Sequence, residues 1–177
     1  MKYGPFLLIK VFMEIKDKVI VITGAAQGLG KNFALDLAIR EAKLALADIN
    51  QELLEEVRKT CEQAGTEARA YDLNVAEEKA VEGFFDQAVS DFGTVDVLIN
   101  NAGITRDGLI ARSKDGEIKK MSLANWQAVI DVNLTGSFLC GREFFVKLLE
   151  QKKSGVCINI SCLLYTSPSP RDRQKSR

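Results

Sequence analysis

Val19-Ile20-Val21-Ile22-Thr23-Gly24-Ala25-Ala26-Gln27-Gly28-Leu29-Gly30 is the stretch that decides the fold. Its first four residues form a β-branched run, which is typical of a buried strand, and residues 28–40 then show apolar side chains at helical spacing. Glycines at a strand-to-helix turn let the backbone approach a pyrophosphate, whose charge the free N–H groups at the helix start attract. The stretch therefore predicts a nucleotide-binding turn, the alternative being an ordinary glycine-rich turn. The candidate residues are Thr23, Gly24, Gln27, Gly28, Leu29 and Gly30.

Short apolar runs alternate with amphipathic segments along the rest of the chain. The expected strands are 19–22, 44–47, 68–71, 95–99 and 156–160. The expected helices are 28–40, 51–64, 74–92 and 122–149, the last three capped by Asn50, Asn74 and Ser122. A polar stretch, 106–120, carries a turn signal at Asp115-Gly116. This order predicts right-handed β-α-β units, and so a doubly wound parallel sheet with helices on both faces and ligands beyond the carboxyl ends of its strands.

Asp48 ends the second expected strand, 18 residues after Gly30. A carboxylate at this place can accept hydrogen bonds from the two ribose hydroxyls of an adenosine. It would repel a 2′-phosphate by at most about 4 kcal/mol at ~4 Å and an effective dielectric of ~20. No Arg or Lys lies at 45–50, and position 27 is Gln. The pattern favours NAD over NADP, although a helix-capping Asp is the alternative.

Polar or small residues follow two further strands. Asp72-Leu73 could contact the edge of the adenine, or Asp72 could be a turn acid. Asn100-Asn101-Ala102-Gly103 follows the fourth strand, where Ala102 and Gly103 would let a flat ring pack on the backbone. The Asn side chains could tie neighbouring loops together, the alternative being a plain Asn-rich turn. Asn100, Ala102 and Gly103 complete the candidate cofactor site.

Composition limits the classes of function. Lys+Arg and Asp+Glu are 24 each, which argues against a nucleic-acid partner held by bulk charge, and no apolar run is long enough to span a membrane. The absence of histidine excludes histidine-based metal sites and acid–base catalysis, and we expect no metal. The cysteines show no C-x-x-C spacing, which indicates reduced thiols in a cytoplasmic protein.

The expected domain is 13–161, which carries a net charge of −5. Residues 1–12 read as an upstream mis-start before Met13, with a weak signal peptide as the alternative. Residues 162–177 differ in composition, with a net charge of +3, and 162–172 can be back-translated into a sequencing-adaptor sequence. We expect this tail to be non-native, the alternative being a genuine disordered basic tail.

Together these motifs resemble the short-chain dehydrogenase/reductase family over residues 13–161, with 100–107 most similar to the 3-oxoacyl-[acyl-carrier-protein] reductases. The resemblance implies a Rossmann-type fold and hydride transfer between nicotinamide and a ketone or secondary alcohol, such as a 3-oxoacyl thioester. It assigns Asn133 to holding a water of the proton relay and Ser161 to hydrogen-bonding the substrate oxygen. It also implies a homo-oligomer formed through helix 122–149, with Trp126, Ile130, Phe138 and Phe145 toward the partner; packing on the chain's own sheet is the alternative, and both can hold.

The family pattern fails after Ser161. In the family, a catalytic Tyr lies roughly a dozen residues past the serine and a Lys follows four residues later, whereas here Tyr165 comes too early and position 169 is Ser. We therefore expect the parent protein to be an enzyme, the chain as written to be inactive, and the uncovered fifth strand to favour aggregation. The alternatives are a non-catalytic dinucleotide-binding module and a sugar-nucleotide epimerase, although the latter usually has G-x-x-G-x-x-G spacing.

Overall fold

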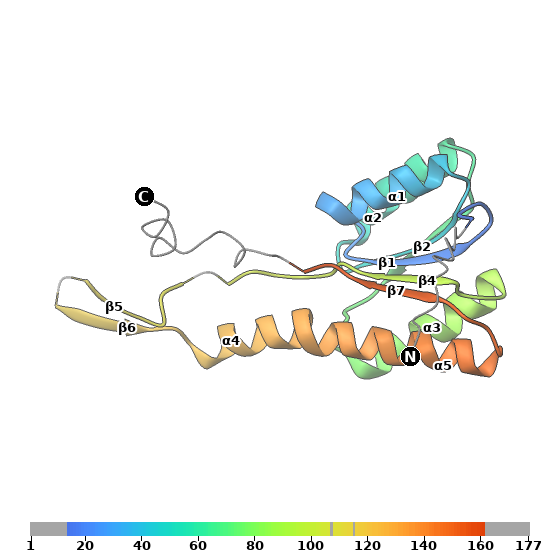
Figure 1. Ribbon diagram of the computed structural model, residues 1–177. Coiled ribbons are helices and arrows are strands. Elements are labelled where there is room, and N and C mark those ends of the chain that lie inside the picture. The colour runs from blue at the N-terminus through green and yellow to red at the C-terminus, as the bar shows by residue number, and fades with distance from the viewer. Residues whose placement is uncertain (1–13, 107, 115, 162–177) are drawn as a thin grey trace, which may run out of the picture.

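A parallel five-stranded sheet lies between two layers of helices (Figure 1). The computed structural model describes residues 14–106, 108–114 and 116–161, so the predictions made for 1–12 and 162–177 lie outside the described residues. The strand order is β3-β2-β1-β4-β7. The bounds are β1 Val19–Thr23, β2 Lys43–Asp48, β3 Ala68–Asp72, β4 Val97–Asn100 and β7 Val156–Asn159. The predicted doubly wound fold is confirmed.

The β1 strand explains why the sheet is covered on both faces. Val19 and Val21 pack into one buried cluster with α3 and α5, whereas Ile20 and Ile22 pack into another with α1 and α2. Side chains alternate along a strand, so a continuous β-branched run has a core on either side. The helix bounds are α1 Gly28–Ile39, α2 Gln51–Gln63, α3 Glu78–Phe92, α4 Leu123–Ile130 and α5 Ser137–Glu150.

The long helix expected at 122–149 contains a wider turn. Ser122 caps α4, because its Oγ accepts from the Asn125 amide at 3.1 Å. Between α4 and α5 the backbone forms a π-helical segment, η1, at Asp131–Gly136. Such turns occur often at functional sites, and this one contains Asn133.

One predicted helix start is wrong. We expected Asn74 to cap a helix, but α3 begins at Glu78. The Asn74 side chain instead closes a local turn: its Oδ1 accepts from the Ala76 amide at 3.1 Å and its Nδ2 donates to Glu77 at 2.8 Å. By contrast, Asn50 caps α2 as predicted, with Oδ1 accepting from the Leu53 amide at 3.1 Å.

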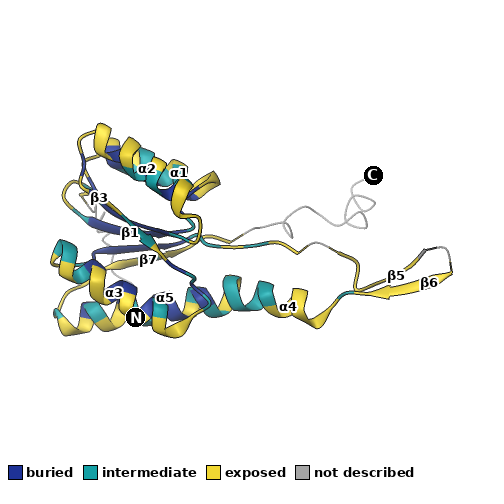
Figure 2. Cartoon of the chain, turned by 180° about the vertical axis from the view of Figure 1, so that it is seen from behind, coloured by how far each residue is buried: buried dark blue, intermediate teal, exposed yellow. Residues whose placement is uncertain are grey.

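The polar stretch 106–120 forms a hairpin that the sequence did not predict beyond its turn. Its strands, β5 (Ala111–Lys114) and β6 (Glu117–Lys120), are antiparallel, and Gly116 at the turn has a φ of +79°. Figures 1 and 2 show the hairpin projecting past the N-terminus of α4, away from the sheet.

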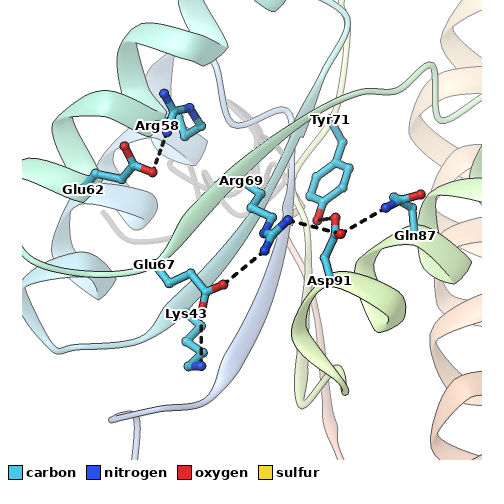
Figure 3. Close-up of polar contacts among 8 residues, drawn as sticks. All are labelled: Lys43, Arg58, Glu62, Glu67, Arg69, Tyr71, Gln87 and Asp91. Atoms are coloured by element: carbon cyan, nitrogen blue, oxygen red, sulfur yellow. Dashed lines mark hydrogen bonds and ion pairs between the residues drawn. The ribbon is translucent and has the colours of Figure 1, made fainter.

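Polar contacts join α3 to α5 and to the edge strand β3. Arg142 on α5 bonds Glu78 on α3 at 2.6 Å. At the edge, Arg69 lies 3.2 Å from Asp91, to which the Tyr71 hydroxyl donates at 2.8 Å (Figure 3). The Tyr71 hydrogen bond lowers the pKa of Asp91, while burial raises the pKa of Tyr71. Within the part of the chain that the structure describes, no helix has the length and apolarity needed to cross a membrane.

Candidate dinucleotide-binding site

A cleft of about 440 Å³ lies beyond the carboxyl ends of β1, β2 and β4. β1 pairs with β2 on one side and β4 on the other, so the strand order reverses here. Open α/β sheets bind ligands at such a switch point. The lining residues are Gly24, Gln27, Leu29, Asp48, Ile49, Asn50, Asn101, Gly103 and Ile104.

The glycine turn brings three backbone segments too close together for side chains. A Cβ on Gly24 would lie 2.8 Å from the Ala102 Cα, and the φ of Gly24 is +66°. A Cβ on Gly30 would overlap the Gly24 carbonyl and lie 2.6 Å from the Asn101 Nδ2. Both positions therefore require glycine, because atoms of neighbouring segments occupy the space that a Cβ would need.

The α1 N-terminus leaves backbone donors available to a ligand. The helix begins at Gly28, and the side chain of its N-cap, Gln27, makes no capping hydrogen bond among the described residues. The first N–H groups of a helix have no partner within the helix, and they carry its partial positive charge. This turn thus has the donors and the space that a pyrophosphate needs.

Thr23 joins the ends of β1 and β4 from beneath the cleft. Its buried Oγ1 accepts from the amides of Asn101 and Ala102, both at 3.1 Å. The Asn101 side chain donates in return to the carbonyls of Thr23 at 3.1 Å and Gly24 at 3.0 Å. The predicted tie between neighbouring loops is made by Asn101, while Thr23 lies below the lining residues.

Asp48 is fixed in the cleft wall by two backbone donors. Its Oδ2 accepts from the Ala26 amide and its Oδ1 from the Asn50 amide, both at 3.0 Å. The two oxygens keep further lone pairs, since a carboxylate has about four acceptor sites. Because Asn50 is the residue that caps α2, Asp48 is not needed for that role.

Three predicted cofactor residues lie at or behind the margin of the cleft. Asp72 is exposed and accepts from the Gln51 side chain at 2.5 Å. Leu73 is buried in the core, and only its backbone is tied to the site, through its amide to the Asp48 carbonyl at 3.1 Å. Asn100 is buried too, and its Nδ2 donates to Asn159 at 2.9 Å and to the Ser137 carbonyl at 3.2 Å.

The two predicted catalytic residues lie on different elements. Asn133, in η1, bonds the backbone of the lining residue Ile104 through both ends of its amide. Ser161 follows β7 and is exposed. No hydrogen bond of the described chain joins Ser161 to Asn133, so the structure links only Asn133 to the cleft.

Four lining residues were not among the predicted site residues. These residues are Ile49, Asn50, Asn101 and Ile104. The sequence indicated only that Asn101 could hold neighbouring loops together and that Asn50 caps a helix. The sequence could have indicated Ile49, because a large apolar residue stands there directly after a strand. In the structure its side chain is 69% exposed.

Several known proteins are similar to this chain in sequence. The family model for short chain dehydrogenases matches residues 18–171. The 3-oxoacyl-[acyl-carrier-protein] reductase of Thermotoga maritima is 34% identical over 167 residues, 93% of this chain and 64% of that protein. The Staphylococcus aureus protein of the same name is 36% identical over 154 residues, 86% of this chain and 59% of that protein. The chain thus spans less than two thirds of these relatives.

Solved structures with the same fold include both NAD and NADP complexes. A short chain dehydrogenase/reductase from Burkholderia phymatum in complex with NAD has a TM-score of 0.73 and 32% identity, covering 84% of this chain and 50% of that one. NAD⁺-bound xylitol dehydrogenase has a TM-score of 0.75 and 31% identity, and the match covers 91% of this chain and 59% of that one. A metagenomic short-chain oxidoreductase in complex with NADP has a TM-score of 0.76 and 30% identity, and the match covers 88% of this chain and 67% of that one.

Proposed function

Because the chain belongs to the short-chain dehydrogenase family, we propose that it binds NAD in the Asp48 cleft and that its parent protein interconverts a ketone and a secondary alcohol. The observation that carries the proposal is the Asp48 carboxylate, held by two amides beside a glycine turn with free helix donors. When bound, the nicotinamide supplies or accepts the hydride. The chain's own residues would bind and orient the dinucleotide.

The NAD preference is argued from charge. Asp48 would accept from ribose hydroxyls through its remaining lone pairs, and it would repel a 2′-phosphate. Gln27 and Asn50, which share the cleft wall, are neutral. No cation among the lining residues of the described chain offsets the repulsion.

The placement of the dinucleotide follows from the lining residues. The pyrophosphate would lie on the amides at Gly28–Gly30, and the adenine end would lie near Asp72 and the backbone of Leu73. The other end would then extend toward Gly103 and Ile104, where Asn133 fixes the loop. Thr23 and Asn100 would act indirectly, by holding the ends of β1 and β4.

We infer that the 177-residue chain itself turns over no substrate. Ser161 would bond the substrate oxygen and the spare N–H of Asn133 could hold a water, but the family's Tyr and Lys have no counterparts at their usual spacing. A tyrosine needs a nearby cation to transfer a proton near neutral pH. The same observation favours a second candidate, a non-catalytic dinucleotide-binding module.

An assay with NADH and an acetoacetyl thioester separates the two parts of this proposal. NADH binding without NADH oxidation is the expected result for this chain. Oxidation that depends on the thioester would contradict the inferred inactivity while supporting the substrate class. A longer parent chain that carries the family's Tyr and Lys should oxidise NADH under the same conditions.

The substrate and the partner are inferred from membership of the family. We propose a small-molecule or acyl-thioester substrate in the cytoplasm, and a homo-oligomer formed through the long helix. In support, Trp126, Phe138 and Phe145 on that helix are exposed, while Phe144 and Leu148 on its opposite face pack into the core. One helix therefore serves its own sheet and retains an apolar surface for a second copy.

Binding itself is tested by fluorescence titration with NADH. Gly30→Ala should abolish binding, because the new Cβ overlaps the Gly24 carbonyl. Gly83→Ala, on α3, is the matched control, since a Cβ there meets nothing within 4 Å, and it should bind like the original chain. Equal binding by both variants would contradict the proposed site.

A further inference from the structure

The widened turn η1 interrupts two regular helices that lie in line, α4 and α5 (Figure 1). The π-helix is rare, and single π-turns inside α-helices occur frequently at functional sites. Each residue of an α-helix turns the chain by about 100°, so one residue gained or lost in this turn rotates the neighbouring side chains. The groups that hold η1 in its wide form therefore decide where Asn133 lies.

Ser137 closes the end of η1 with its side chain. It is the first residue of α5, and its amide donates to the Leu134 carbonyl, three residues back. In a regular α-helix that amide would donate to the Asn133 carbonyl, four residues back. The Ser137 hydroxyl makes this contact instead, since its Oγ donates to the Asn133 carbonyl at 3.0 Å. A serine that bonds back in this way often bends a helix, so the hydroxyl supports a departure from the α-helical pattern here.

The carbonyl of Ser137 is held from the sheet. Asn100, buried at the end of β4, donates through its Nδ2 to this carbonyl at 3.2 Å and to the Asn159 Oδ1 at 2.9 Å. The Asn100 Oδ1 is buried and has no donor among the described residues. Reversing the amide would place this oxygen against the Ser137 carbonyl, where two acceptors would meet. The orientation that leaves Oδ1 unpaired is thus the one that holds Ser137.

Gly136 fixes the other side of the turn. A Cβ at this position would lie 2.7 Å from the Val75 Cγ2 and 3.2 Å from the Val75 carbonyl oxygen. Val75 itself is part of the buried core. The end of η1 therefore lies between the sheet, through Asn100, and the chain segment that contains Val75.

The hydrogen bonds form a continuous series across the fold. The series runs from Asn159 on β7 to Asn100 on β4, then to Ser137, to Asn133 and to Ile104 in the cleft wall. Ser137 takes part in it twice, with its carbonyl toward the sheet and its hydroxyl toward Asn133. It therefore connects the sheet to η1.

We propose that Ser137 is a positioning residue for the cleft, because its hydroxyl holds η1 in the π-helical form that sets Asn133 against the Ile104 loop. The inference rests on the NAD-binding cleft proposed above, and Ser137 itself does not line that cleft. With alanine at 137, the Asn133 carbonyl loses this donor and the turn returns toward the α-helical pattern. A change of one residue in the turn then swings Asn133 away from Ile104 by about 100°.

Hydrogen exchange of the Ile104 amide tests the proposal without any cofactor. This amide donates to the Asn133 Oδ1, so its exchange rate reports that bond directly. In ¹⁵N-labelled chain, Ser137→Ala should speed the exchange about tenfold, whereas Ser137→Thr, which keeps a hydroxyl, should stay within about twofold of the original rate. An unchanged rate in Ser137→Ala, or equal acceleration in both variants, would overturn the proposal.

Thr60→Ala is the matched control. The Thr60 Oγ1 bonds back to the Glu56 carbonyl at 2.8 Å, with the same spacing of four residues, but within the regular helix α2 on the opposite face of the sheet. Its loss should leave the Ile104 exchange rate within about twofold of the original. An acceleration as large as that of Ser137→Ala would come from a general loss of helix structure and would overturn the specific role of Ser137.

NADH titration shows whether Ser137 acts through Asn133. Ser137→Ala should weaken NADH binding about threefold in the original chain and should add nothing in the Asn133→Ala background. Additive losses in the double variant would contradict the proposal, since the two residues would then act separately. If the original chain does not bind NADH, the proposed function fails, and the exchange of the Ile104 amide still decides whether Ser137 holds the turn.

Discussion

The side chain of Asn133 pairs with the backbone of Ile104 through both ends of its amide. Its Oδ1 accepts from the Ile104 amide at 2.8 Å, and its Nδ2 donates to the Ile104 carbonyl at 3.0 Å. The pair joins η1 to the loop after β4, and Ile104 lines the cleft. The π-helical segment and the cleft wall are therefore mechanically connected.

Replacing Asn133 should loosen this wall. Asn133→Ala removes two exposed hydrogen bonds, so unfolding free energy should fall by about 1–2 kcal/mol. NADH affinity should fall as well, because the Ile104 loop loses its anchor. Urea unfolding and NADH titration measure the two effects. An unchanged affinity would show that the loop is held without Asn133.

Thr23 should matter more for stability than for cofactor contact. Thr23→Val keeps the shape of the side chain but leaves the amides of Asn101 and Ala102 without their acceptor. Two unpaired donors in a partly buried place should cost about 2–4 kcal/mol in urea unfolding. Thr23→Ser keeps the hydroxyl and should cost much less. Equal losses would show that packing by the methyl group, rather than the hydroxyl, stabilises the turn.

Asp91 should make stability depend on pH. The Tyr71 hydroxyl, Gln87 and Arg69 lower the pKa of Asp91 in the folded chain. A carboxyl group whose pKa is lowered in the folded chain stabilises the fold at pH values above its pKa in the unfolded chain, ~3.9. This contribution is lost as the pH falls through the folded pKa. Tyr71→Phe should therefore be less stable than the original chain at pH 7. Urea unfolding between pH 7 and pH 3 should show that difference shrinking; a constant difference would contradict the linkage.

The three cysteines that the structure describes should differ in reactivity. Burial raises the pKa of Cys61 to about 11 and that of Cys140 to about 12. The thiolate is the reactive form, so neither should be alkylated in the native chain at pH 8. Half-buried Cys157, whose pKa is also raised, should react slowly but before the other two. Peptide mass spectrometry after iodoacetamide treatment checks the order, with urea-unfolded chain as the control.

Most of the sheet was predictable because a strand that is buried on both faces is a continuous run of apolar residues. The β-branched run at 19–22 and the caps at Asn50 and Ser122 depend only on local sequence. The false helix start at Asn74 shows the limit of this reasoning, since its side chain can close a turn as readily as it caps a helix.

Other features depend on contacts that spacing cannot reveal. β5 and β6 are rich in charge and lack an apolar face, so the sequence predicted only their turn. Asn100 and Leu73 stand in motif positions but point into the core, a direction set by the strands on either side. Asn133, in the π-helical segment, bonds the backbone of Ile104, which lies 29 positions away in sequence.

The ratio of NADH to NADPH dissociation constants, measured for the original chain and for Asp48→Asn, shows whether Asp48 makes this cleft select NAD. Asparagine is nearly isosteric with aspartate, and it removes the charge that would repel a 2′-phosphate. We predict that the original chain binds NADH at least about tenfold more tightly than NADPH, and that Asp48→Asn loses most of this preference by gaining NADPH affinity. An equal affinity for both coenzymes in the original chain, or a ratio that Asp48→Asn leaves unchanged, would contradict it.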